Sequence, residues 1–263
     1  MQHADEQKSS DGNQSRCSFV ITGFGPFAGV PNNPTSTLIS CLRNNKAPLF
    51  NDNGVHIRET HILDTSADAA KSEILGIYSR LCSDKLINGG GGNHSDDCLT
   101  KDAIVVIHLG VNYRGEKMRL EQCAYNDATF RVPDNNGYQP QEQCILGNSS
   151  TFGYCLQTTL DLNEICEEMH QQGQNECCVS QDPGRFVCNY TYCLSLDQCQ
   201  TANDALERSR QQSTNQFVEC YSLFLHVTPF AVISKDKQIS FIYNLLKSIE
   251  KNVLTRKTFL KHI

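Results

Sequence analysis

The sequence has 263 residues, 39% hydrophobic and 20% charged, so it can bury a sizeable core as one large domain or two small ones. Its net charge of −6, with 23 Lys and Arg residues that do not cluster, argues against binding to nucleic acid or an anionic membrane. No apolar run approaches the roughly 20 residues that cross a bilayer, and the polar residues 1–16 do not resemble a signal peptide, which indicates a cytoplasmic protein.

The first half of the chain alternates between strand-like and helix-like segments. Residues 1–16 are predicted to be a disordered polar tail, and the β-branched run at 17–24 a buried strand. Further strands are predicted at 55–63 and 102–111, and helices at 35–46 and 66–82, where Leu38, Ile39, Leu42, Ile74, Ile77, Tyr78 and Leu81 recur at helical spacing. The glycine-rich, polar stretch 83–100 is predicted to be a surface insert. Because the run at 102–111 is apolar throughout, as buried parallel strands are, this half indicates an α/β sheet.

The second half continues the alternation. Residues 120–148 are rich in Asn, Asp, Gly and Pro and are predicted to be mostly loop or hairpin. After them we expect helices at 161–173, 186–196 and 236–251, strands at 177–182 and 221–230, and a flexible insert within 197–216. A single three-layer α/β domain over 17–263, with surface inserts near 83–100 and 197–216, accommodates all these elements.

Fourteen cysteines are many for a chain of this length. Without a secretion signal, thiols in a long chain normally stay reduced, so the count does not indicate a disulfide framework. The paired CxxC motifs of structural zinc sites are also missing, since Cys177 and Cys178 are adjacent and Cys188, Cys193 and Cys199 are not matched by a second set. The sequence therefore predicts no metal site and no cofactor.

Three side chains with catalytic chemistry fall near predicted strand ends or the turns that follow them, namely Glu121, Cys188 and His226. A helix beginning at Cys188 favours its thiolate, a nearby histidine takes the thiol proton, and an acid orients the imidazole. Taken singly, however, a cysteine in an apolar run is more often a core residue, and a histidine at a strand end often has a structural role only.

Four segments resemble sequence blocks of one family. VITGFGPFAGVPNNPTS at 20–36 resembles the N-terminal signature of pyroglutamyl-peptidase I (pyrrolidone-carboxylate peptidase), a family of cytosolic cysteine peptidases that remove N-terminal pyroglutamate from peptides. Residues 119–140, 183–196 and 223–230 resemble that family's glutamate, nucleophile and histidine blocks, in the family's order. Four ordered blocks, spread over about 20–230, are far more specific than one short motif.

The resemblance implies a fold and a set of catalytic roles. The fold would be a three-layer α/β/α sandwich with a mixed central sheet, like that of the purine nucleoside phosphorylases. Cys188 would be the nucleophile, His226 the base that activates it and later protonates the leaving amine, and Glu121 the acid that orients the imidazole. Arg131 lies where the family often carries an arginine near the active site, and it would help to polarise the developing oxyanion.

The resemblance also implies the substrate, a peptide with an N-terminal pyroglutamate. This group is a small, neutral, flat lactam, so its pocket needs apolar walls and backbone hydrogen bonds but no charged partner. Phe24 and Phe27 would sandwich the ring, Phe186 would complete the wall, and Asn33 would fasten the loop. Such a pocket would reject a free amino terminus, because burying an unpaired ammonium is costly.

Two other classes of function remain open. The chain could be an inactive relative that binds blocked peptide N-termini, although the complete Glu121, Cys188 and His226 set argues against it. It could also be a nucleoside phosphorylase-like enzyme, but the sequence has no glycine-rich phosphate loop of recognised spacing, and GGGG at 89–92 is more typical of a linker. Oligomeric state differs among relatives, so a homo-oligomer is left open.

Overall fold

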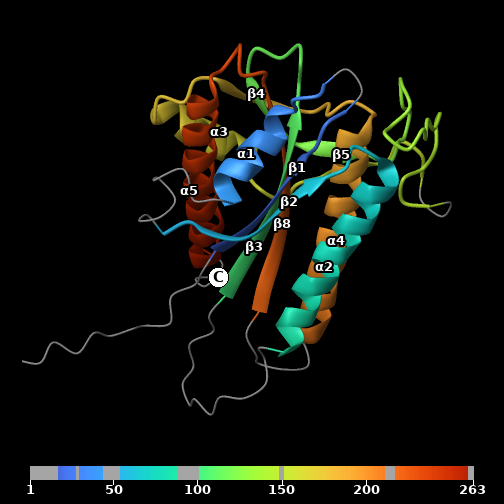
Figure 1. Ribbon diagram of the computed structural model, residues 1–263. Helices are drawn as coiled ribbons and strands as arrows, with labels where there is room; N and C mark the ends of the chain where they lie inside the picture. The colour runs from blue at the N-terminus through green and yellow to red at the C-terminus, as the bar shows by residue number, and fades with distance from the viewer. Residues whose placement is uncertain are drawn as a thin grey trace, which may run out of the picture.

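The computed structural model describes residues 17–27, 30–43, 54–87, 101–147, 151–210 and 217–259. Its elements in chain order are β1 (Cys17–Phe24), α1 (Pro34–Arg43), β2 (His56–Leu63), α2 (Ala67–Ile87), β3 (Lys101–Val111), β4 (Met118–Glu121), β5 (Cys123–Tyr125), β6 (Cys155–Gln157), α3 (Leu162–Gln171), β7 (Cys177–Ser180), α4 (Val187–Arg210), β8 (Phe217–Val227) and α5 (Lys235–Phe259). They form a three-layer α/β/α sandwich (Figure 1), as predicted.

The central sheet is mixed, with strand order β2-β1-β3-β8-β4-β7. Strands β2, β1, β3 and β8 run parallel, whereas β4 is antiparallel to β8 and parallel to the edge strand β7. The apolar run of β3 lies in the middle of the sheet, where both of its faces are covered. Strands β5 and β6 pair with each other in a separate antiparallel ribbon.

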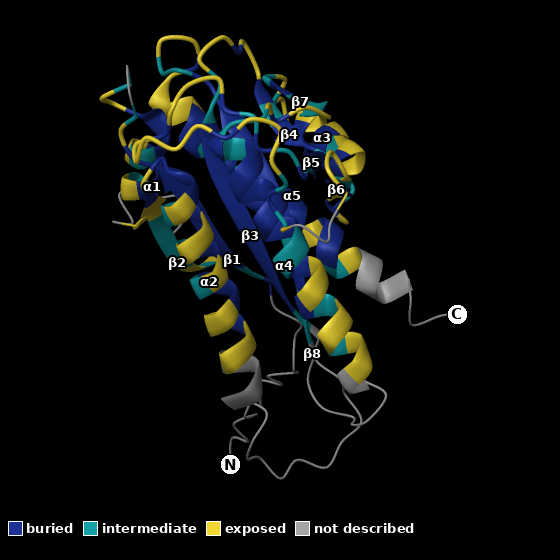
Figure 2. Ribbon diagram, turned by 90° about the vertical axis from the view of Figure 1, so that its right-hand side faces the viewer, coloured by how far each residue is buried: buried dark blue, intermediate teal, exposed yellow. Residues whose placement is uncertain are grey.

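Helices cover both faces of the sheet, with α1, α3 and α5 on one side and α2 and α4 on the other (Figure 1). Successive residues of β1 serve the two layers, because side chains alternate across a strand. Ile21 belongs to the same buried cluster as Leu38 and Phe241, and Val20 to the buried cluster on the other face, which includes Ile74. Figure 2 shows the result, with buried strands between helices whose outer faces are exposed.

Two helices extend further than their sequence patterns predict. Helix α2 continues through Ile87, and α4 continues through Arg210, into stretches that the sequence assigns to the inserts at 83–100 and 197–216. The polar residues after 197 include one that bonds the sheet. The Asn203 side chain accepts from the backbone N–H of Cys220 in β8 at 2.9 Å and donates to its carbonyl oxygen at 2.8 Å. Residues 1–16, 44–46, 88–100 and 211–216 of the predicted segments lie outside the described residues.

Strand β4 is an element of the central sheet that the sequence did not predict. It has only four residues, and its last two fall in a segment expected to be mostly loop or hairpin.

None of the helices within the described residues is long and apolar enough to cross a membrane.

Close packing of α1 on β1 depends on Gly23. A Cβ atom at this position would lie 2.8 Å from Ile39 Cγ1 and 3.1 Å from the Thr35 carbonyl oxygen. We expect Gly23→Ala to lower the free energy of unfolding by about 1–3 kcal/mol, as overpacking of a core does, measured by urea denaturation. Gly76→Ala, within α2, is the control and should raise it by roughly 0.5–1 kcal/mol, since alanine favours helix. Equal effects from the two substitutions would contradict this packing.

Candidate active site

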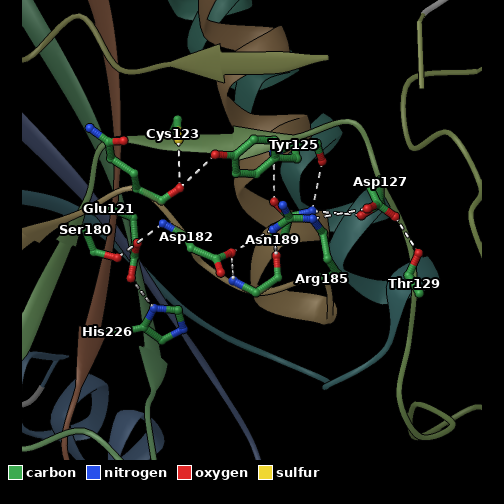
Figure 3. A network of polar contacts seen from close by, with 12 residues as sticks. Glu121, Cys123, Tyr125, Asp127, Thr129, Ser180, Asp182, Arg185, Asn189 and His226 are labelled. Carbon is green, nitrogen blue, oxygen red and sulfur yellow. Dashed lines mark hydrogen bonds and ion pairs between the residues drawn. The ribbon is translucent and has the colours of Figure 1, made fainter. Parts of the chain in front are cut away.

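A buried ion pair joins two strands at the centre of the candidate site. His226 Nδ1 lies 2.7 Å from Glu121 Oε1 (Figure 3). In the antiparallel pairing of β4 with β8, Glu121 is opposite Phe224, so His226, two residues further along β8, is its diagonal neighbour on the same face. The direction of the short strand β4 therefore decides which histidine Glu121 can reach.

The carboxylate of Glu121 is fully buried, and its second oxygen, Oε2, has no hydrogen-bond partner within the described part of the chain. A buried charge of this kind needs a positive partner, and His226 is that partner. Burial lowers the pKa of His226, but hydrogen bonding and negative charge from Cys188 and Glu121 outweigh this effect and raise its pKa to about 9. The imidazole is therefore protonated at neutral pH.

Cys188 is the second residue of α4 and is half-buried, so its thiol lies at the N-terminus of a long helix. The partial positive charge of a helix N-terminus stabilises a thiolate. Because Nδ1 of His226 is occupied by Glu121, Nε2 is the ring nitrogen left to interact with Cys188. The structure thus brings together all three residues that the sequence singled out as a catalytic set.

Gly110, the penultimate residue of β3, is a close neighbour of the thiol that sequence analysis missed. A Cβ atom here would lie 3.1 Å from Cys188 Sγ and only 2.6 Å from Cζ of the Phe224 ring. No side chain fits between these groups, so glycine lets the helix N-terminus approach the sheet. A glycine interrupting an apolar strand is the signal that could have indicated this close approach.

Asn189 ties the start of α4 to the segment that follows β4. Its buried side-chain amide accepts a hydrogen bond from Tyr125 N at 2.8 Å and donates to the carbonyl oxygens of Tyr125 and Asp127, both at 2.9 Å (Figure 3). The Tyr192 hydroxyl donates to the backbone carbonyl of Glu121 at 2.9 Å. Helix α4 therefore holds both the nucleophile candidate and the strand that carries Glu121.

Arg185 forms a second set of polar contacts three residues before Cys188. It pairs with Asp127 at 3.1 Å and Asp182 at 2.8 Å, and its guanidinium lies 4.0 Å from the centre of the Tyr125 ring (Figure 3). Arg131, by contrast, is exposed and makes no hydrogen bond or ion pair with the described residues. Sequence reasoning selected Arg131 and missed Arg185, the arginine that orders the loop before the nucleophile.

The predicted pocket residues fall into two groups of aromatic contacts. Phe27 packs on Phe186, with ring centres 5.2 Å apart, and Phe130 joins them at 4.8 Å from Phe186. Phe24 is instead buried against Phe224, at 6.5 Å, and the Phe224 ring lies 4.8 Å from that of His226. The structure therefore brings Phe27 and Phe186 together, whereas Phe24 is buried in a separate aromatic contact with Phe224.

Asn33 fastens the loop that carries Phe27. Its side chain donates to the carbonyl oxygen of Gly25 at 3.0 Å and accepts from the backbone N–H and the hydroxyl of Thr35 at 3.1 and 2.9 Å. The Thr35 hydroxyl also lies 2.9 Å from the carbonyl oxygen of Phe24, so its one hydrogen has two alternative acceptors, and its oxygen accepts from the Phe24 N–H at 2.9 Å. These bonds join the end of β1 to the start of α1 and fix the loop between them.

Comparison with known proteins connects this arrangement to one family. A family model described as pyroglutamyl peptidase matches residues 96–208, which include Glu121 and Cys188 but end before His226. Human pyroglutamyl-peptidase 1 is 26% identical over 186 residues, which span 70% of this chain and 75% of that protein. The pyrrolidone-carboxylate peptidase of Pyrococcus furiosus is 22% identical over 182 residues, or 69% of this chain and 73% of that protein.

Solved structures extend the likeness over more of the chain. The pyrrolidone carboxyl peptidase from Thermococcus litoralis has a TM-score of 0.65 at 20% identity, over 91% of this chain and 96% of that one. Pyroglutamyl peptidase I of Bacillus amyloliquefaciens has a TM-score of 0.63 at 20% identity, over 89% and 97%. The protein thus has the α/β fold of the pyrrolidone carboxyl peptidases. Distant homologues and structural neighbours from the pyroglutamyl peptidase I family match most of the chain.

The anchoring role of Asn189 can be measured. Asn189→Ala removes three hydrogen bonds to part-buried backbone groups of Tyr125 and Asp127. We expect the free energy of unfolding to fall by roughly 2–4 kcal/mol, measured by urea denaturation. Asn163→Ala, at an exposed position of α3, should change it by less than about 0.5 kcal/mol. A loss at Asn189 no larger than at Asn163 would refute the anchoring role.

Proposed function

We propose that this protein is a cysteine peptidase that hydrolyses the N-terminal pyroglutamyl group from peptides, acting as a single catalytic domain over residues 17–263. The observation that carries the proposal is the buried pair of His226 and Glu121, 2.7 Å apart, beside a cysteine at a helix N-terminus. Similarity to distant relatives supports the substrate, since these proteins bear the names pyroglutamyl-peptidase and pyrrolidone-carboxylate peptidase. The family resemblance also supports a cytosolic location.

In the proposed mechanism, Cys188 reacts as a thiolate paired with the protonated His226. The sulfur attacks the carbonyl carbon of the pyroglutamyl residue, and backbone N–H groups at the start of α4 stabilise the oxyanion. The imidazolium then donates its proton to the leaving amine as the C–N bond breaks, leaving a thioester on Cys188. A water molecule, deprotonated by His226, hydrolyses the thioester and restores the thiolate and the imidazolium. Glu121 keeps the imidazole oriented through both steps.

The aromatic cluster around Phe27 supports a small, neutral acyl group as substrate. Phe130, on the segment after β5, is fully buried and packs behind Phe186. Phe27, on the loop before α1, and Phe186, on the turn before α4, are half-buried and provide the apolar surface. We propose that the lactam ring packs on these side chains, that Asn33 keeps the Phe27 loop in place, and that Phe24 supports the wall from beneath. Arg131, exposed and adjacent to Phe130, is proposed to meet the substrate as the oxyanion develops.

The reaction and its nucleophile can be tested together. We expect purified protein, under reducing conditions, to release a fluorescent amine from its pyroglutamyl amide, and Cys188→Ala to lower kcat at least about a thousandfold while the thermal melting curve is retained. Cys41→Ala, which changes another half-buried cysteine, should keep full activity.

The same assay tests the choice of substrate. The prolyl amide of the same amine has a ring of the same size but carries an ammonium in place of the lactam. We expect at least a hundredfold lower kcat/KM for it, because the ammonium would be buried without a partner. Absence of pyroglutamyl release by a well-folded wild type would show a binding relative rather than an enzyme. Equal rates on the two substrates would refute the neutral pocket.

The raised pKa of His226 predicts how activity depends on pH. Protonation of the leaving amine requires the imidazolium, so kcat/KM should fall as pH rises through about 9. The stability due to this pair has the same sign: it is fully present below the ordinary histidine pKa of 6.5 and is lost as pH rises through about 9. Glu121→Gln removes a negative charge that raises this pKa, so we expect the alkaline limb of the pH–rate profile to move to lower pH. A limb that stays in place would show that Glu121 does not set the charge of His226.

A further inference from the structure

A second cluster of reactive side chains lies on α3 and β7, outside the candidate active site. Cys166 and His170 stand one turn apart on α3, and Cys177 is the first residue of β7. Their sulfur and nitrogen atoms all lie within 4.8 Å of one another. Cys166 and Cys177 are buried, whereas His170 is exposed, so the cluster reaches from the core to the surface.

The distances within the cluster match one coordination geometry. The sulfurs of Cys166 and Cys177 are 3.6 Å apart, and Cys166 Sγ is 3.6 Å from His170 Nε2. Two thiolates on a tetrahedral zinc ion stand about 3.8 Å apart, and a thiolate and an imidazole nitrogen about 3.6 Å, given the bond lengths usual for zinc. Two of the three ligand separations therefore already suit a zinc ion, and the third, from Cys177 Sγ to His170 Nε2, is within 4.8 Å.

We propose that Cys166, His170 and Cys177 bind a zinc ion through two sulfurs and Nε2, with water as the fourth ligand on the exposed side of His170. On binding, the two thiols release their protons to solvent. His170 Nε2 lies 3.2 Å from the Cys177 carbonyl oxygen, a contact in which Nε2 donates. To ligate zinc, the imidazole carries its proton on Nδ1 instead, and Nε2 gives up this contact.

Charged side chains of both signs lie near the cluster. Glu167 and Glu176 are the nearby acidic groups and Lys117 is the nearby basic one. Glu176 is partly neutralised by Lys237, at 3.6 Å.

The zinc site would be structural and separate from the candidate catalytic centre. Cys177 begins β7 opposite Met118, and Ser180 ends it opposite Glu121, so the two sites lie at opposite ends of the β4–β7 pair. Strand β7 is the edge of the sheet, and α3 packs against it. A bound ion would therefore clamp a short edge strand to its covering helix. This inference does not depend on the proposed peptidase activity.

The test uses the full-length Cys188→Ala protein, reduced and freed of metal, so that the catalytic thiol cannot bind the ion. We expect titration with Co²⁺ to give one equivalent of bound metal with a thiolate-to-cobalt absorption band, which Zn²⁺ then displaces. His170→Ala, an exposed change that leaves the core intact, should weaken binding at least about tenfold, and Cys177→Ala should remove the thiolate band of the site. The controls are His56→Ala, an exposed histidine on β2, and Cys17→Ala, a buried cysteine on β1, and neither should change the affinity.

Thermal unfolding gives an independent measurement. Zn²⁺ at about a hundredfold excess over its Kd should raise the Tm of the Cys188→Ala protein by about 5 °C or more, and His170→Ala should lose most of this shift. The proposal is overturned if the reduced protein binds no Co²⁺, or if His170→Ala binds it as tightly as His56→Ala does. A spectrum without the thiolate band would also overturn it, since the ion would then lie elsewhere.

Discussion

The site depends on the buried contact between Glu121 and His226. A fully buried carboxylate is tolerated only beside a positive charge, and the antiparallel insertion of β4 next to β8 provides that partner by placing the two residues diagonally on one face of the sheet. Had β4 run parallel to β8, as β3 does, its last residue would have met different positions of β8. The reversal of one four-residue strand thus sets the charge state of the histidine that stands beside Cys188.

Helix α4 connects this pair to the thiol. The first turn of α4 carries Cys188 and Asn189, and the amide of Asn189 holds the backbone that follows β4. Tyr192 lies one turn after Cys188 on the same helix, and its hydroxyl donates a hydrogen bond to the backbone carbonyl of Glu121. The absence of a side chain at Gly110 allows the helix N-terminus to approach the sheet. The strand that carries Glu121 and the helix that carries Cys188 are therefore joined by direct hydrogen bonds.

The strand pair β4–β7, at the edge of the sheet, carries different side-chain chemistry at its two ends. At the end near Ser180, the β4–β7 pair supports Glu121 in a dry environment suited to acid and base chemistry. At the end near Cys177, the same pair meets α3 and gathers two thiols and an imidazole. Short edge strands are weakly held by their own few hydrogen bonds, so a fold that depends on the position of β4 gains from any second anchor on β7.

Periodicity and apolar runs in the sequence determined most of the layers, because β1, β3 and β8 are largely apolar segments and the helices repeat their buried residues every three or four positions. Resemblance to family blocks selected Glu121, Cys188 and His226 as a set. The tertiary structure alone decided the direction of β4, the full length of α4, and the roles of Gly110, Asn189 and Arg185. It also brought Cys166 and His170 to Cys177, in a spacing that no zinc motif describes. The physical reason is separation along the chain: Glu121 and His226 are 105 residues apart. The four residues of β4 are too few to show a pattern from which their pairing could be predicted. The packing of the whole sheet determines that pairing.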